Sequence, residues 1–231
     1  QTAISDLEVV QKDAQSNLYY IDYEIEETFE KITIATTRPE TMMGDTAIAV
    51  NPKDKRYISL IGKSVKIPLG KRSIKIIPDH YADPEQGSGA VKITPAHDFN
   101  DYVVGKRNKL EVINIFEKDG SINENGFEEF KGLDRFEARK LIIDKLKSTG
   151  QLLKIEQIKN KVPYGDRSGT IIEPLLTEQW FVDAKFLSKK SIDVVKKGKT
   201  SFYPSNWKKT FFQWMNEIEP WCISRQIWWG H

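Results

Sequence analysis

The feature of this sequence that most restricts its fold is a series of about seven short apolar segments bounded by glycine, proline or asparagine. These segments are rich in isoleucine, valine, threonine and tyrosine, which favour β-strands. Few stretches between them show helical periodicity, so we predict an α+β fold in which peripheral helices surround a β-barrel-like or strongly bent sheet. The expected strands are residues 18–25, 31–37, 46–50, 65–67, 74–77, 90–94 and 112–116.

Two helices are expected beside this sheet, at residues 98–107 and 134–148. The second is the clearer one, because Asp134 and Glu137 form a capping-box pattern and Gly150 follows the last turn. We expect this helix to pack on the sheet and to take no part in chemistry. Its predicted apolar face consists of Phe136, Ala138, Leu141, Ile142 and Leu146.

The C-terminal part differs in composition, since all six tryptophans lie between Trp180 and Trp229. We predict a small mixed or helical segment here, with one helix at residues 206–218 whose aromatic side needs a partner surface. The domain boundary is placed between residues 158 and 159, which gives domains 1–158 and 159–231. This part is also rich in lysine; a solvated face is favoured, and an RNA backbone contact is the alternative.

Charge and cysteine content narrow the classes of function. The 35 Lys+Arg and 33 Asp+Glu residues give a net charge of +2, so any nucleic-acid contact must be local. The single cysteine excludes an internal disulfide and a cysteine zinc site, and it fits the reducing cytoplasm. No apolar run approaches the ~20 residues of a membrane helix and no signal peptide is recognisable, so no membrane partner is expected. The chain starts at Gln1 without methionine and ends at His231 within a motif, which favours a piece of a longer protein.

Residues 87–102 predict a polar pocket formed by a glycine turn, a short strand, a proline break and a helix start. On the strand, Val91 and Ile93 alternate with Lys92 and Thr94. We therefore expect the apolar pair to face a core and the polar pair to face a wet surface.

Two carboxylates follow at the helix start. Asp98 is either a helix N-cap or a functional group, whereas Asp101, one turn into the helix, is expected to be held ionised and to bind a cation such as an amino group. His97, Asp98 and Asp101 also resemble a metal-ligand set. We expect no metal, because there is no second histidine cluster and the only cysteine, Cys222, is distant.

A second polar group is expected where the strand at residues 31–37 ends. Pro39 stops the strand, so Thr36, Thr37, Arg38 and Thr41 crowd together at its end. Hydroxyls and a guanidinium at a strand end are suited to line a pocket. The alternative is a threonine-rich strand end with a solvated arginine.

Five motifs occur together and in order: residues 36–41 (TTRPET), 44–47 (GDTA), 92–102 (KITPAHDFNDY), 162–167 (VPYGDR) and 221–231 (WCISRQIWWGH). The first three resemble the editing (CP1) domain inserted in valyl-tRNA synthetases, which are class I enzymes. The last two resemble the segment that returns to the catalytic domain of those enzymes. The isoleucyl and leucyl relatives usually carry Pro-Trp-Thr where residues 38–41 stand here, which favours the valyl family.

The resemblance implies proofreading by hydrolysis of threonine wrongly attached to valine tRNA, with threonyl-adenylate as a further candidate substrate. In valyl enzymes generally, a hydrophobic synthetic pocket rejects threonine against valine only by ~10², so a second site has to supply the remaining discrimination. The residues expected to be catalytic are Asp101, Lys92, Asp98, Thr94 and Arg38, and those expected to bind substrate are Thr36, Thr37, Glu40, Thr41 and His97.

Within that set, Asp101 is expected to bind the α-ammonium group, and Thr94 or Asp98 to read the threonine hydroxyl. The wall at residues 36–41 is expected to hold the terminal adenosine or the water. The expected partners are the 3′ end of tRNA(Val) carrying threonine and the remaining domains of the same chain, in a monomer. No cofactor is expected for editing, whereas ATP and Mg²⁺ belong to the synthetic domain outside this sequence.

Two alternatives stay open at this point. One is a tRNA-docking or spacer module without hydrolysis, and the other is the editing domain of an isoleucyl or leucyl relative. The sequence lacks the His-Ile-Gly-His and Lys-Met-Ser-Lys-Ser signatures of the ligase reaction, so it is not expected to make aminoacyl-tRNA itself.

Overall fold

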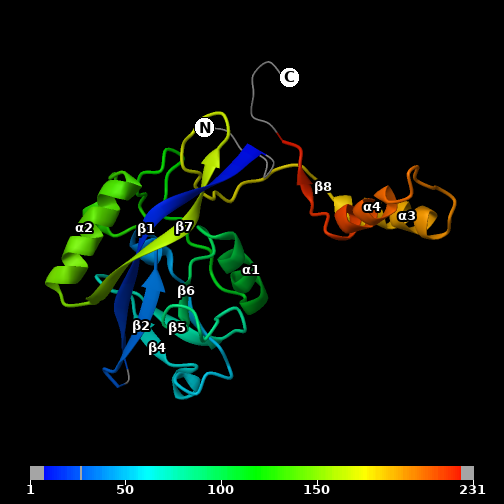
Figure 1. Ribbon diagram of the computed structural model, residues 1–231. Coiled ribbons are helices and arrows are strands. Elements are labelled where there is room, and N and C mark those ends of the chain that lie inside the picture. Colours follow the sequence, from blue (N-terminus) through cyan, green and yellow to red (C-terminus); the bar gives the residue numbers. More distant parts are fainter. Residues whose placement is uncertain (1–7, 27, 225–231) are drawn as a thin grey trace. The chain divides into compact units, whose positions relative to one another are not determined.

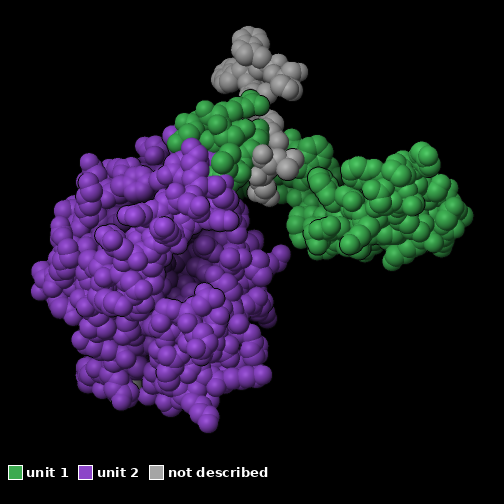
Figure 2. All heavy atoms as spheres, in the orientation of Figure 1, with its two compact units in different colours: residues 1–10, 165–169, 177–231 green, residues 11–164, 170–176 purple. Residues whose placement is uncertain are grey.

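The computed structural model describes residues 8–26 and 28–224 (Figure 1). They divide into two compact units (Figure 2). The larger unit consists of residues 11–164 and 170–176, and the smaller unit of residues 1–10, 165–169 and 177–231. The domain boundary predicted between residues 158 and 159 lies inside strand β7 and stays a prediction.

One seven-stranded sheet forms the larger unit, with strand order β2-β1-β4-β5-β3-β6 and with β7 paired to β1. Neighbouring strands are antiparallel, except that β3 and β5 are parallel. The terminal strands β2 and β6 contact each other, so the sheet curls into a half-barrel, as the predicted α+β class with a bent sheet requires. The strands are β1 (Val9–Ile25), β2 (Lys31–Thr36), β3 (Ala47–Val50), β4 (Ser64–Lys66), β5 (Ser73–Pro78), β6 (Ala90–Ile93) and β7 (Leu152–Gly165).

The prediction of a strand at residues 112–116 is wrong. Only an isolated bridge between Phe116 and Ile122 forms there. Side chains take the place of a ladder: Asn114 accepts from the Phe116 N–H at 3.1 Å and donates to its carbonyl at 2.9 Å. The Ile115 N–H donates to a ring nitrogen of His97.

The seventh strand, β7, was missed by the sequence analysis. Its alternation is lysine-rich and most of its side chains are exposed or half-buried, so it lacks the apolar pattern of the other strands. Strand β1 is also longer than predicted, since it starts at Val9 rather than at residue 18.

Two helices cover the sheet (Figure 1). Helix α2 (Arg135–Ser148) contributes to the main core, whereas helix α1 (Phe99–Asn108) packs in a smaller apolar cluster. Strand β3 lies between the two: Ile48 and Val50 enter the main core, and the alternating alanines enter the smaller cluster. All four residues of β3 are buried, which fixes the backbone that leads into the polar site described below.

The predicted apolar face of α2 is too wide. Ala138, Ile142 and Leu146 are buried as expected, but Phe136 and Leu141 are exposed. Phe136 lies instead beneath the guanidinium groups of Arg135 and Arg139, at 4.7 and 5.2 Å from its ring centre.

Three short 3₁₀ segments complete the larger unit: η2 (Pro39–Gly44), η3 (Ile58–Leu60) and η4 (Glu128–Phe130). Every residue of η2 is buried, and η2 packs against α2. This contact places α2, which was expected to pack on the sheet, next to the predicted site wall.

The described residues of the smaller unit form a two-stranded sheet and two helices. Strands β8 (Phe181–Val182) and β9 (Trp221–Cys222) pair antiparallel, and helix α3 (Ala184–Lys196), which was not predicted, packs against α4 (Trp207–Asn216). Helix α4 ends two residues before the predicted limit at Ile218. The part of the return-segment motif at residues 225–231 lies outside the described residues. None of the helices described here is long and apolar enough to span a membrane.

Candidate functional site

The centre of the candidate site is the Lys92 ammonium group on β6. Its Nζ donates to the Thr41 hydroxyl at 2.8 Å, to Asp45 Oδ1 at 3.0 Å and to the Thr94 hydroxyl at 2.5 Å. The three N–H donors of the ammonium group are thus matched by three acceptors. Because Lys92 and Thr94 are 7% and 1% exposed, the expectation that this pair faces a wet surface is wrong. The pair faces a buried polar cluster instead, while Val91 and Ile93 face the apolar cluster under α1 as predicted.

Asp45 is a site residue that the sequence analysis missed. It is wholly buried, accepts from Thr94 and Lys92, and accepts from the Tyr23 hydroxyl at 2.8 Å. Arg72 holds the preceding backbone by donating to the carbonyls of Met43 and Asp45. Burial raises the pKa of Asp45, against the opposing effect of Lys92. The only signal for it in the sequence was its place in the GDTA motif, directly before an apolar strand.

Asp101 lies in the first turn of α1 and is 6% exposed. Its Oδ2 accepts from the Thr94 N–H at 2.9 Å, which ties the helix start to the end of β6. Burial raises the pKa of Asp101 to about 6, although Lys92 and the Thr94 N–H oppose the rise. Burial therefore affects this carboxyl more than the helix start does, although the carboxyl is still mostly ionised at pH 7, as expected.

Tyr81 lies beside Asp101. Burial and then the charges of Asp101 and Asp98 raise the pKa of Tyr81 to about 12, so its hydroxyl stays protonated. Asp101 is thus a buried anion in a group of donors, and such an anion can bind an ammonium ion.

Asp98 is the N-cap of α1, which answers part of the question left open by its sequence. Its Oδ1 accepts from the N–H groups of Asn100 at 2.8 Å and Asp101 at 3.1 Å. Both cap bonds end on the same oxygen, so Oδ2 is not used in capping. The side chain is exposed, unlike that of Asp101.

The Arg38 guanidinium forms the second part of the site. Its Nη1 donates to the His97 carbonyl at 3.0 Å, its Nε donates to Glu40 at 3.3 Å, and its Nη2 donates to Glu173. Burial lowers the pKa of Arg38, but the Glu173 and Glu40 carboxylates outweigh this effect and raise it. The expected alternative of a solvated arginine is therefore wrong, since only 29% of the side chain is exposed.

The threonines of the predicted wall hold its backbone. The Thr36 hydroxyl accepts from the Arg38 N–H at 3.1 Å, and the Thr41 hydroxyl donates to the Arg38 carbonyl at 3.0 Å. Thr41 also accepts from Lys92, so it joins the two parts of the site. Thr37 lies half-buried in the bend between β2 and η2.

Glu40 is completely buried on η2 and has two cationic partners. Besides Arg38, Arg139 of α2 donates to it through two N–H groups, each at 2.7 Å. This fork geometry is the arrangement in which arginine binds carboxylates most strongly. Helix α2 therefore packs on the sheet and also pairs a carboxylate of the site, while its expected lack of a part in chemistry stays a prediction.

His97 is 2% exposed and has an unusual polar environment. Its Nε2 accepts from the Ile115 N–H at 3.0 Å, which places the proton of the neutral ring on Nδ1. Burial, followed by the charges of Arg38 and Lys92, lowers the pKa of His97 to about 3. Its Nδ1 is buried without a hydrogen-bond partner among the described residues and lies 4.0 Å from Glu173 Oε1.

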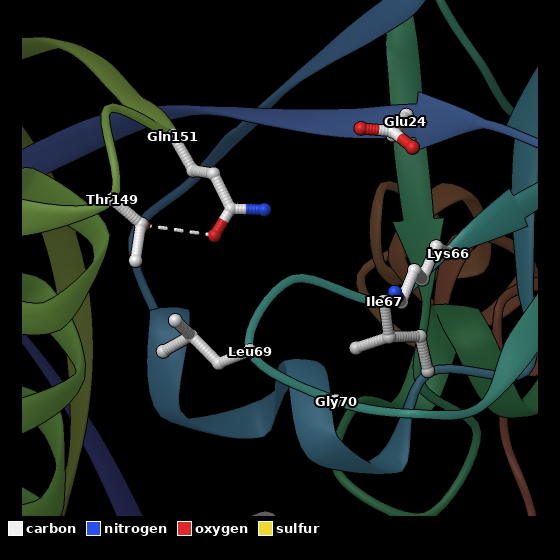
Figure 3. A pocket seen from close by; sticks show the side chains of 7 residues that line it. All are labelled: Glu24, Lys66, Ile67, Leu69, Gly70, Thr149 and Gln151. Carbon is white, nitrogen blue, oxygen red and sulfur yellow. Dashed lines mark hydrogen bonds between the residues drawn. The ribbon is translucent and has the colours of Figure 1, made fainter. Parts of the chain in front are cut away.

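The described residues show no group of three or more His, Cys, Asp or Glu side chains that is arranged to hold a metal ion. A cavity of about 250 Å³ lies elsewhere in the larger unit, beside β1 and β4 (Figure 3). It is lined by Glu24, Lys66, Ile67, Leu69, Gly70, Thr149 and Gln151, none of which was predicted as a site residue.

The fold thus brings most of the predicted residues into one polar network. Thr41 bridges Lys92 and Arg38, Thr94 bridges Lys92 and Asp101, and the His97 N–H donates to the Thr94 carbonyl. The residues that the sequence analysis missed are Asp45, Arg135, Arg139 and Glu173.

A family model described as "tRNA synthetases class I (I, L, M and V)" matches residues 1–231. The chain is 67% identical to the valine--tRNA ligase of Pelagibacter ubique (strain HTCC1062) and 53% identical to that of Francisella tularensis subsp. tularensis, in both cases over its whole length. It covers 26% and 25% of these two proteins, and so spans about a quarter of their length. A solved LeuRS-tRNA-LeuAMS ternary complex from Agrobacterium radiobacter K84 is similar over 65% of this chain and 20% of that chain, with 20% identity and a TM-score of 0.47.

Proposed function

Because the chain belongs to the class I tRNA synthetases, we propose that its larger unit hydrolyses an amino acid wrongly attached to tRNA, namely threonine on valine tRNA. Threonyl-adenylate is a second candidate substrate. The two relatives named above, which match over the whole chain, are valine--tRNA ligases, and the family includes the I, L, M and V enzymes. The ligase reaction itself, with its ATP and Mg²⁺, belongs to the remaining parts of such a protein.

The observation that supports this function best is the environment of Asp101. A carboxylate that is only 6% exposed, and whose charged form is disfavoured by burial, is suited to bind the α-ammonium group of an aminoacyl ester, because a bound cation favours the charged form. Binding a cation there would offset the cost of burying the charge. The free amino group distinguishes an aminoacyl ester from the rest of the tRNA.

Discrimination against valine requires a polar contact that valine cannot satisfy. A site that hydrogen-bonds the threonine hydroxyl leaves its own polar groups unpaired when valine enters, and such unpaired groups are costly. We assign this contact to Asp98, because its Oδ2 is not used in capping the helix, whereas the Thr94 hydroxyl is already bonded to Asp45 and Lys92. Thr94 and Lys92 then shape the pocket without touching the hydroxyl.

The nucleophile in this proposal is a water molecule. The Lys92 ammonium uses its donors on Thr41, Asp45 and Thr94, and the neutral His97 ring is turned toward Ile115 and Glu173. Neither is therefore assigned as the base, and the terminal ribose hydroxyl of the tRNA is the group nearest the ester that can assist the water. The wall at Thr36 to Thr41 holds the terminal adenosine.

The test is a deacylation assay with threonyl-tRNA(Val), using the full-length protein and its Asp101→Ala variant. We expect the variant to lose at least about 10-fold in hydrolysis, because a charged hydrogen-bonding partner is removed. Asp98→Ser, which keeps a capping oxygen, serves as the matched variant and is expected to lose the preference for threonine over valine while the helix stays capped. Wild-type hydrolysis by Asp101→Ala would show that the ammonium group is bound elsewhere.

A binding measurement distinguishes editing from a spacer function. The extensive internal pairing of Lys92 and Arg38 also fits a purely structural network, which is the observation that favours a spacer. Binding to the 231-residue chain, which excludes the ligase site of the longer protein, makes the comparison: a non-hydrolysable threonyl-adenosine analogue bound no more tightly than the valyl analogue would support the spacer. We expect tighter binding of the threonyl analogue.

A further inference from the structure

We propose that Glu173 is a positioning residue of the editing site, which acts by holding the Arg38 guanidinium in place. With Glu173, the proposal adds segment 170–176, which follows β7 in the chain, to the segments that form the site. This inference rests on the proposed function, and it adds a residue that lies outside every motif by which the site was recognised.

Segment 170–176 is fixed to the larger unit by its backbone as well as by Glu173. Tyr164 and Ile171 form a bridge, the Ile172 N–H donates to the Pro163 carbonyl at 3.0 Å, and Arg135 donates to the Ile171 carbonyl. The residues on both sides of these contacts belong to the larger unit. The position of Glu173 is therefore determined by the fold and not by a free loop.

Glu173 is the anion that two arginines share. Its side chain is 17% exposed, its Oε1 accepts from Arg38 Nη2, and its Oε2 lies 3.5 Å from Arg135 Nε. Burial raises the pKa of Glu173, and Arg38 and Arg135 oppose the rise. Glu40, the other carboxylate bonded to Arg38, is itself shared with Arg139. Loss of Glu173 would leave one carboxylate among three arginines.

The orientation of Arg38 depends on this arrangement. Its three nitrogens each have a different acceptor, namely Glu40, the His97 carbonyl and Glu173. A planar guanidinium held at three points cannot rotate without breaking a bond. Without Glu173, one end of the guanidinium group is released. The hydrogen bond to the His97 carbonyl, which connects the wall at residues 36–41 with the turn between β6 and α1, is then no longer held in a fixed geometry.

His97 provides a second, independent sign that Glu173 faces the site. Its Nδ1, which bears the proton of the neutral ring, has no hydrogen-bond partner among the described residues and lies 4.0 Å from Glu173 Oε1. Buried donors without partners are rare in folded proteins. A small shift of the carboxylate, or one bridging water, would satisfy this donor, so Glu173 lies between Arg38 and His97.

A purely structural function is the competing explanation, in which Glu173 only attaches segment 170–176 through Arg135. The two explanations differ in what happens when Arg38 is absent. If Glu173 acts through Arg38, its removal has little further effect in an Arg38→Ala background. If it only attaches the segment, its removal costs the same in both backgrounds.

The test is therefore a double-mutant cycle in the full-length protein with Glu173→Ala, Arg38→Ala and the pair, measured as kcat/KM for threonyl-tRNA hydrolysis. We expect Glu173→Ala to lower kcat/KM about 10-fold alone and less than about 2-fold in the Arg38→Ala background. Equal losses in the two backgrounds would overturn the proposal. Glu124→Gln, at an exposed glutamate of the same unit, is the control and should leave kcat/KM unchanged. Glu173→Gln, which keeps the size of the side chain, replaces Glu173→Ala if the alanine variant does not fold.

A second measurement does not depend on editing activity. The rate of phenylglyoxal modification at Arg38, followed by peptide mass spectrometry, reports how firmly its guanidinium is held. We expect this rate to rise several-fold in Glu173→Ala and to stay constant in Glu124→Gln, with the half-exposed Arg56 as internal reference. An unchanged rate at Arg38 would overturn the positioning role. A wild-type protein without deacylase activity would instead contradict the proposed function. The modification rate would then still show whether Glu173 holds the Arg38 guanidinium.

Discussion

Asp101 shows how burial and helix position act in opposite directions on one carboxylate. The sequence places it in the first turn of a helix, where the helix dipole favours the charged form. The fold also leaves it only 6% exposed, and burial raises its pKa to about 6. The native state thus holds a proton on this carboxyl over a pH range in which the unfolded chain does not.

This difference predicts a pH dependence of stability. The ordinary pKa of 3.8 and the value of about 6 in the fold correspond to a free-energy difference of up to about 3 kcal/mol. Because the folded-state pKa is raised, the contribution is fully present below pH ~4 and is lost as the pH rises through ~6. We expect Asp101→Asn, which keeps an acceptor for the Thr94 N–H, to gain in stability relative to the wild type between pH 4.5 and 7.5.

Urea unfolding of the 231-residue chain at several pH values measures this gain. Asp144→Asn, at an exposed carboxylate of α2, is the matched control and should show no such trend. A difference between Asp101→Asn and the wild type that stays constant over this pH range would contradict the raised pKa.

At the scale of elements, helix α2 does more than cover the sheet. Its Arg139 binds Glu40 on η2, so the buried carboxylate of the site wall is paired by a helix that lies almost a hundred residues later in the chain. Removal of one partner of a buried ion pair leaves an uncompensated charge and typically costs about 3–5 kcal/mol.

We therefore expect Arg139→Leu to lower the free energy of unfolding by about 3 kcal/mol, the low end of that range, because Arg38 still faces Glu40. The free energy of unfolding of Arg139→Lys should lie between those of the wild type and Arg139→Leu, because lysine keeps the positive charge but cannot donate two parallel hydrogen bonds. Urea unfolding of the three proteins is the measurement. Lys140→Leu, at an exposed position of the same helix, is the control. A loss in Arg139→Leu no larger than in Lys140→Leu would mean that the pair with Glu40 contributes nothing to stability.

The elements also show which parts of this fold a sequence can predict. Strands such as β2 and β6 were predicted because their apolar residues alternate and a proline or glycine marks their ends. Strand β7 was not predicted because its surface is lysine-rich and largely exposed, so its residues lack the apolar alternation of the other strands. Residues 112–116 resembled a strand, but the side chains of Asn114 and His97 bind the backbone that a ladder would use.

The same distinction applies to the candidate site. Residues close together in the sequence, such as Lys92, Thr94 and Asp101, were grouped correctly because a strand followed by a helix keeps them near one another. Asp45 and Glu173 were missed, because their partners are separated from them by 47 and 135 residues and no local pattern encodes such pairs. Burial changed the interpretation as well, since Lys92 pairs inside the protein rather than facing solvent.

At the scale of the whole molecule, the two compact units are interleaved along the chain. Residues 170–176 belong to the larger unit although residues 165–169 before them and residues 177–231 after them belong to the smaller one. The predicted boundary between residues 158 and 159 would cut β7 and remove both its C-terminal half and Glu173. The larger unit should therefore be complete only in a chain that extends to residue 176.

Two shortened chains test this, one that ends at residue 158 and one that ends at residue 176. The shorter chain loses the Ser16–Asn160 hydrogen bond, the β7 residues after 158, and the Glu173 carboxylate between Arg38 and Arg135. Loss of a charged hydrogen-bonding partner costs about 1.5–3 kcal/mol, the missing half of β7 adds to this loss, and 1 kcal/mol corresponds to about 2–4 °C in a domain of this size. We expect thermal unfolding of the shorter chain to occur at least about 6 °C below that of the longer chain, and with lower cooperativity. Equal midpoints would show that the unit ends at residue 158 and that segment 170–176 does not contribute to its stability.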